Sequence, residues 1–179
     1  MGTPGYLPPE AACGEADTMD ARSDVYGLGA ILFEILTGRL PHEFTNFLDL
    51  ARKLLQEDAP RAIDIDEAVP EPLSELCAAC LARSMDDRPS DAEAVADAIR
   101  RWQVERERAR EVEGWLREAS TALEAAADLQ GGAMLQQVDR AIAAVGQVLT
   151  REPEHARALE LRVRADGLRE QGMREREAG

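Results

Sequence analysis

Two stretches near the N-terminus decide the fold: Met1-Gly2-Thr3-Pro4-Gly5-Tyr6-Leu7-Pro8-Pro9-Glu10 and, after thirteen intervening residues, Asp24-Val25-Tyr26-Gly27-Leu28-Gly29. Glycines and prolines interrupt the first twenty residues so often that we expect an irregular segment there. The second stretch opens an apolar run over residues 23–37, which predicts a helix.

This helix has recognisable signals at both ends. Ser23 or Asp24 is the expected N-cap, and Gly38 is placed to end the helix. The apolar side chains cover more than one face, so we expect burial on nearly all sides. They are Val25, Leu28, Ile31, Leu32, Ile35 and Leu36.

A third stretch, Asp86-Asp87-Arg88-Pro89-Ser90, lies well downstream. In this order and at these separations, the three stretches resemble motifs from the second half of bacterial serine/threonine protein kinases. The resemblance covers residues 1–102. It implies an all-α fold, the helical C-lobe of a kinase without its nucleotide-binding lobe, followed by a helical extension.

The resemblance also assigns roles to residues. Glu10, Asp24, Gly29 and Arg88 would be structural motif residues, with Asp24 holding a catalytic loop and Glu10 paired to Arg88. The alternative is that Glu10 and Arg88 are separate solvated charges. The resemblance also implies a substrate-docking loop that marks preference for serine or threonine, made of Thr3, Pro4, Gly5, Tyr6 and Leu7. The alternative is that this terminus is flexible and unpaired.

The chain departs from the family pattern at its start and at two positions. Pro8 stands where alanine is usual, and His42 where an aromatic is usual. Met1 resembles an internal residue of a longer kinase, so we expect a truncated gene, a split gene or a misassigned start codon.

The groups that transfer phosphate are missing from the sequence. Phosphoryl transfer needs a glycine-rich loop, a phosphate-binding lysine, a catalytic aspartate and Mg²⁺ ligands. The chain has one lysine, Lys53, and no His-Arg-Asp or Asp-Phe-Gly tripeptide. We therefore expect no catalytic, cofactor-binding or metal-binding residue, and ATP with Mg²⁺ only if an upstream kinase lobe is supplied.

The charge of the chain excludes some classes of binding partner. The net charge of −14 argues against nucleic acid and anionic membranes. It is uneven: residues 1–100 carry 8 basic and 20 acidic side chains, and residues 101–179 carry 13 and 15. The longest apolar run is too short to span a bilayer, and no export signal opens the chain, so we expect a cytoplasmic protein.

The three cysteines give a weak metal signal. Cys77 and Cys80 have C-x-x-C spacing, but no second pair of cysteines or histidines accompanies them. They recur with Leu73, Leu76 and Leu81 at helical spacing, which favours two small apolar residues on a buried helix face. A metal or redox role is the alternative.

The rest of the first 102 residues predicts three more helices. They cover residues 44–55, 73–83 and 90–102, with an acidic, proline-bounded connector over residues 58–72. Ser90 and Glu93 have the spacing of a capping box at the start of the last helix.

Beyond residue 102 the chain becomes rich in arginine and glutamate. Residues 103–130 predict an amphipathic connecting helix, whose stripe includes Val112, Trp115, Leu116 and Leu123. Residues 131–179 predict two further helices around Pro153 and resemble part of a tetratricopeptide repeat. Since a solenoid needs about three repeats, the alternative is a helical hairpin docked on a neighbour.

These observations support two functions. The first is the C-terminal part of a serine/threonine kinase, truncated, pseudokinase-like and inactive as it stands. The second is a scaffold that recruits protein partners through its helical tail, and a decayed remnant is a third reading. The helix over residues 25–36 is apolar on most sides, but the segments that would cover one side of it in a kinase are missing from this sequence. We therefore also expect this helix to expose apolar surface and to favour self-association, unless the tail helix folds back over it.

Overall fold

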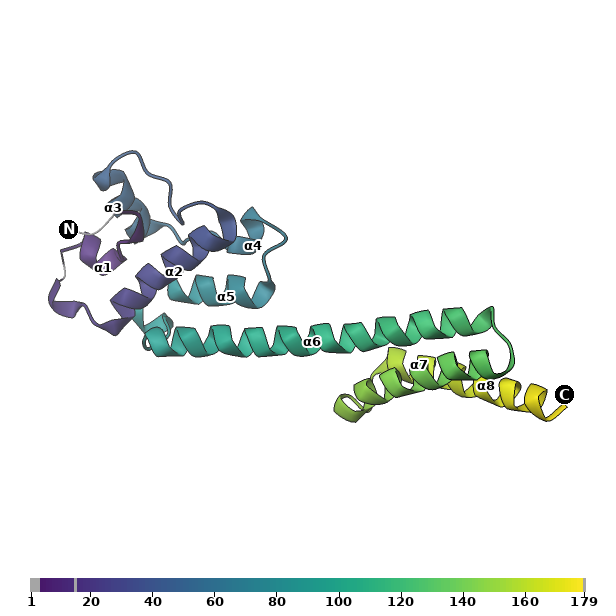
Figure 1. Cartoon of the computed structure of the whole chain (residues 1–179). Coiled ribbons are helices and arrows are strands. Elements are labelled where there is room, and N and C mark those ends of the chain that lie inside the picture. The colour runs from purple at the N-terminus through teal and green to yellow at the C-terminus, as the bar shows by residue number, and fades with distance from the viewer. Residues whose placement is uncertain (1–3, 15, 179) are drawn as a thin grey trace. The chain divides into compact units, whose positions relative to one another are not determined.

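The computed structural model describes residues 4–14 and 16–178, and within these residues every regular element is helical, which confirms the all-α class (Figure 1). The chain divides into unit 1, Met1–Val104, and unit 2, Glu105–Gly179. The α-helices are α1 Pro9–Ala12, α2 Ala21–Thr37, α3 Phe47–Gln56, α4 Ala62–Ile65, α5 Glu71–Cys80, α6 Ala92–Ala127, α7 Gly131–Arg151 and α8 Ala156–Ala178. Short 3-10 turns lie at Pro4–Tyr6, Ala16–Thr18 and Met85–Asp87.

Helix α2 begins earlier than the sequence predicted. Asp20 is the N-cap, because its side chain accepts a hydrogen bond from the Arg22 backbone N–H at 2.8 Å. The proposed caps Ser23 and Asp24 therefore lie inside the helix. Gly38 does end the helix, with a φ of 70° that favours glycine.

The expectation that α2 is buried on nearly all sides was wrong. One face packs in the core of unit 1 against α5, through Val25, Tyr26, Ala30 and Phe33. Another face is open: Leu28, Ile31 and Ile35 are 36%, 46% and 75% exposed. These three side chains, which we call the α2 stripe, recur at helical spacing of three and four residues and so share one side of the helix.

The other helices of unit 1 follow the predicted order with shifted ends. Asn46 caps α3, and the acidic connector contains the short helix α4. Asp91, and not Ser90, caps α6 by accepting from the Ala94 backbone N–H at 2.8 Å. Helix α6 then continues without a break through Trp102, where we had placed a helix end.

Unit 2 has its own core, formed by the last part of α6 with α7 and α8. Val112, Leu116 and Leu123 are buried in this core. The suggestion that this stripe folds over α2 was therefore wrong, since its apolar side chains already pack on α7 and α8. The chain turns at the predicted place between α7 and α8, around Pro153.

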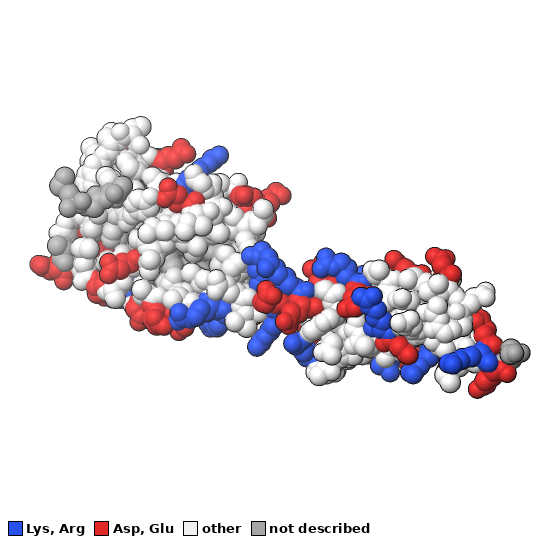
Figure 2. Space-filling model, in the orientation of Figure 1, with Lys and Arg blue, Asp and Glu red and all other residues white. Residues whose placement is uncertain are grey.

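Charged side chains cover much of the surface (Figure 2). On the face in view, acidic groups predominate on unit 1, whereas basic and acidic groups are intermixed on unit 2, in line with the uneven charge of the sequence. In the part of the chain that the structure describes, no helix is both long and apolar enough to cross a bilayer.

His42 gives unit 1 a sensitivity to mild acid. The imidazole is 9% exposed, and burial, with a smaller effect from Lys53, lowers its pKa below 6.5 although Glu57 opposes the shift. A lowered pKa means that the fold favours the neutral ring, so this stability is present above pH 6.5 and is lost as pH falls.

We expect the urea midpoint of unit 1 to fall in the parent protein as the pH is lowered from 7 to below 6.5, and to fall less in His42→Phe. An equal decline in both proteins would contradict this.

Candidate functional site

The predicted substrate-docking loop is fastened to the helical core. Thr3 lies outside the described residues, and Pro4–Tyr6 forms a 3-10 turn. The Tyr6 hydroxyl donates to Glu34 of α2 at 2.6 Å, and this hydrogen bond raises the pKa of Tyr6. A Cβ on Gly5 would lie 2.7 Å from Leu40, so the backbone approaches closely there. The described part of the loop is thus held in place.

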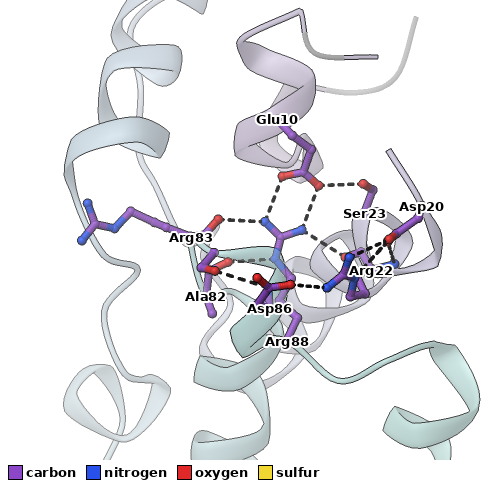
Figure 3. Close-up of polar contacts among 9 residues, drawn as sticks. Glu10, Asp20, Arg22, Ser23, Ala82, Arg83, Asp86 and Arg88 are labelled. Atoms are coloured by element: carbon purple, nitrogen blue, oxygen red, sulfur yellow. Dashed lines mark hydrogen bonds and ion pairs between the residues drawn. The ribbon is translucent and has the colours of Figure 1, made fainter. Parts of the chain in front are cut away.

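Glu10 and Arg88 meet, as predicted, across 78 residues of sequence (Figure 3). The two guanidinium nitrogens donate to the two carboxylate oxygens at 2.8 and 2.9 Å. The side chains are 6% and 0% exposed for Glu10 and Arg88, so the alternative of two solvated charges was wrong. We call this bidentate pair the clamp. It ties α1, directly behind the docking loop, to the segment before α6.

Every remaining donor of Arg88 has a backbone acceptor. Its nitrogens also donate to the carbonyl oxygens of Ala82, Arg22 and Arg83, at 2.8, 3.1 and 3.2 Å. The guanidinium lies 5.0 Å from the centroid of the Tyr26 ring, within range of a cation–π contact. The clamp therefore joins α1, the start of α2 and the turn after α5.

Glu10 is held in its charged form. Burial alone would raise its pKa, but hydrogen bonds from Arg88 and from the Ser23 hydroxyl outweigh burial and lower the pKa below 4.5. The Ser23 hydroxyl donates to the same carboxylate at 2.6 Å. The clamp is thus stable at neutral pH and weakens as the pH falls below 4.5 and Glu10 takes up a proton.

The acidic motif residue Asp24 differs from Glu10 in its surroundings. It is exposed near the N-terminal end of α2. It precedes Leu28 by four residues, so it lies on the side of α2 that carries the α2 stripe. A carboxylate at one end of an open apolar face is a suitable anchor for backbone N–H groups of another segment.

Gly29 is required by the packing of α2 on α5. A Cβ at Gly29 would lie 2.6 Å from the Cβ of Cys80 and 3.2 Å from the backbone carbon of that residue. The Cys77 thiol donates to the Gly29 carbonyl at 3.4 Å. No group of three or more potential metal-ligating His, Cys, Asp or Glu side chains occurs within residues 4–14 and 16–178. The buried Cys77 and Cys80 side chains take part in the packing of α2 on α5.

The three thiols should differ sharply in reactivity. Burial raises the pKa of Cys77 to about 12 and that of Cys80 to about 11, whereas Cys13 is exposed. Because the thiolate is the reactive form, we expect one fast thiol per native chain and three after unfolding. Titration with a chromogenic disulfide measures this, and Cys13→Ser should remove the fast phase. Two or three fast thiols in the native chain would contradict the packing.

Sequence reasoning missed several polar partners. Ser23 is one of the two predicted helix caps, but its hydroxyl donates to Glu10 instead. Glu34 interrupted an apolar run, which was the one available signal that it had a polar partner. Arg22 forms surface ion pairs with Asp20 and Asp86 at 2.8 and 2.7 Å. No pattern in the sequence indicated these pairs.

In the described residues, a helical unit whose first loop is joined to the turn before its last helix by a buried Glu–Arg pair agrees with the kinase lower lobe that the sequence resemblance implies. Comparison with known sequences agrees: residues 1–99 match the protein kinase domain. Since this match spans more than half of the 179 residues, the chain belongs to the protein kinase family.

Several of the relatives are bacterial serine/threonine kinases. The chain is 38% identical over 97 residues to serine/threonine-protein kinase PksC of Streptomyces coelicolor, and 39% identical over 92 residues to PknL of Mycobacterium tuberculosis. These matches cover 54% and 51% of this chain, but only 17% and 23% of the relatives. The probable kinase PknB of Lactococcus lactis is 36% identical over 93 residues, which are 52% of this chain and 14% of that protein.

Proposed function

We propose that residues 1–99 serve as the substrate-docking lower lobe of a serine/threonine protein kinase, and that the chain by itself transfers no phosphate. The clamp is the observation that supports this most strongly. A buried bidentate pair that fastens α1, with the Tyr6–Glu34 hydrogen bond in front of it, holds the docking loop in a defined position. Such an arrangement suits the binding of an extended protein substrate.

The absence of transfer follows from the residues of the chain. The one lysine, Lys53, donates to the Glu43 carbonyl on unit 1, and no phosphate-binding loop surrounds it. The sequence has no aspartate in a His-Arg-Asp or Asp-Phe-Gly context. ATP and Mg²⁺ would therefore bind only when the remaining kinase lobe is supplied.

The open face of α2 is where the remaining lobe would dock. Leu28, Ile31 and Ile35 offer apolar contact, and Asp24 offers a carboxylate for backbone N–H groups of a catalytic loop. An open apolar stripe also favours association with other proteins or with a second copy. The same face of α2 could therefore contact either the rest of a kinase or another protein partner.

A transfer assay tests the proposal. We expect no ATP·Mg²⁺-dependent thermal shift of the purified chain and no radiolabel transfer to itself or to a generic serine/threonine substrate. Asp24→Asn serves as a control, because trace activity from a contaminating kinase would survive it unchanged. Reproducible Mg²⁺-dependent transfer that Asp24→Asn abolishes would contradict the proposed inactivity.

A second candidate function is a cytoplasmic scaffold that recruits proteins through unit 2. The supporting observation is that unit 2 has its own core and yet leaves apolar side chains open on α8, where Val163 is 74% exposed. The helix–Pro153 turn–helix arrangement of α7 and α8 suits a tetratricopeptide-like partner surface. This scaffold role needs no cofactor. Nucleotide binding on reconstitution with a kinase lobe would separate the first function from the second.

A further inference from the structure

A groove lies within unit 2, on the surface between α6 and α7. Its volume is about 700 Å³, within the range of roughly 300–1,000 Å³ that is usual for ligand sites. It is lined by Gly114, Arg117, Thr121 and Ala125 of α6 and by Gln137 and Arg140 of α7, among others.

Three of the six α6 residues that line the groove are small. A Cβ added at Gly114 would meet nothing within 4 Å, and Ala122 and Ala125 have only methyl side chains. Ala125 is exposed, so its methyl group is open to the groove. At these three positions the small side chains let the backbone of a second chain approach the helix closely.

The polar groups of the groove favour an anion. Arg117 is exposed, and among the described residues its guanidinium has no hydrogen-bond or ion-pair partner. Arg140 pairs with Glu118 at 2.7 Å, with both side chains well exposed to solvent. Two arginines and one glutamate give the lining a charge of +1, in a chain whose net charge is −14.

The groove also offers hydrogen bonds for a peptide backbone. The Thr121 hydroxyl and the Gln137 amide line it from opposite helices. Each can both donate and accept, as a peptide N–H and C=O require.

We propose that this groove binds an extended, acidic peptide segment of a partner protein. The carboxylates would pair with Arg117 and Arg140, and the backbone would lie over the small residues of α6. The proposal deepens the second candidate function, on which it rests, by naming the partner's chemistry. It places no requirement on unit 1.

Fluorescence anisotropy with the full chain tests the proposal. Two probes are fluorescein-labelled peptides, one of alternating glutamate and alanine and one with glutamine in place of glutamate. The third probe is a fluorescently labelled nucleoside diphosphate, which represents a small anion. We expect the glutamate peptide to bind at least tenfold more tightly than the glutamine peptide, and binding to weaken as salt rises. Equal affinity for both peptides, or no binding to the glutamate peptide, would overturn the proposal. Tighter binding of the nucleotide would replace the peptide with a small phosphate ligand.

Two variants locate the site. Ala125→Glu adds a carboxylate to the groove and should abolish binding, whereas Ala109→Glu makes the same change at an exposed α6 position that does not line the groove and should leave affinity unchanged. Arg117→Gln should weaken binding about fivefold, the equivalent of one exposed charge pair of about 1 kcal/mol. Circular dichroism confirms that the variants remain helical.

The outcomes separate the groove from the scaffold function. If Ala125→Glu and Ala109→Glu bind the glutamate peptide equally, the groove is not the site and the inference fails. The scaffold function fails separately, if deletion of residues 131–179 leaves capture of protein partners by the chain unchanged.

Discussion

Replacing Arg88 with alanine is expected to destabilise unit 1 by about 3–5 kcal/mol, the cost of leaving a buried carboxylate without its partner. Arg88 is fully buried, and Glu10 would lose two hydrogen bonds at once. The three carbonyl groups that Arg88 also satisfies would lose their donors. Because whole domains are stable by about 5–15 kcal/mol, this loss is a large part of the stability of unit 1.

Protection of Cys77 and Cys80 from thiol reagents reports unit 1 alone, since both thiols are buried in that unit. Urea titration of this protection measures the loss. Arg83→Ala is the matched control: it removes a surface pair with Asp58, 45% and 80% exposed, that should contribute at most about 1 kcal/mol. Equal effects of the two substitutions would mean that the clamp does not hold the fold.

The second large effect is expected at Gly29. Gly29→Ala places a Cβ 2.6 Å from the Cβ of Cys80, a distance that real Cβ atoms essentially never show. The nearest atoms belong to a Cβ and to backbone, so they cannot turn aside. We expect a loss of about 1–3 kcal/mol, as overpacking usually costs, and early loss of Cys80 protection in urea.

Gly27→Ala is the matched control on the same helix. A Cβ there would meet only the Tyr6 carbonyl oxygen, at an ordinary 3.8 Å. Since alanine favours helix over glycine by about 1 kcal/mol, Gly27→Ala should be neutral or stabilising. If both substitutions destabilise equally, the close packing of α2 on α5 is not the cause.

The sequence was sufficient for features that a local signal or a known motif specifies. Gly38 ends α2 because only glycine readily adopts the positive φ found there. The Glu10–Arg88 contact spans 78 residues and was available only through the family resemblance. No pattern of charge or spacing connects these two residues by itself.

Other features depend on tertiary structure. Asp20 and Ser23 are both good N-caps, but in the folded chain Asp20 caps α2 and the Ser23 hydroxyl donates to Glu10. The open α2 stripe could not be read from hydrophobicity, because the sequence does not show which apolar face has a neighbour. The continuity of α6 across Trp102 was missed because a change in composition need not break a helix.

The most direct test of the account is a chimeric kinase. Residues 1–99 would replace the matching segment of PknL, and transfer of labelled phosphate to a protein substrate would be measured beside the parent kinase and an Arg88→Ala chimera. If these residues are a working lower lobe, the chimera transfers phosphate and the Arg88→Ala chimera does not. A folded chimera without transfer, beside an active parent, would contradict the account.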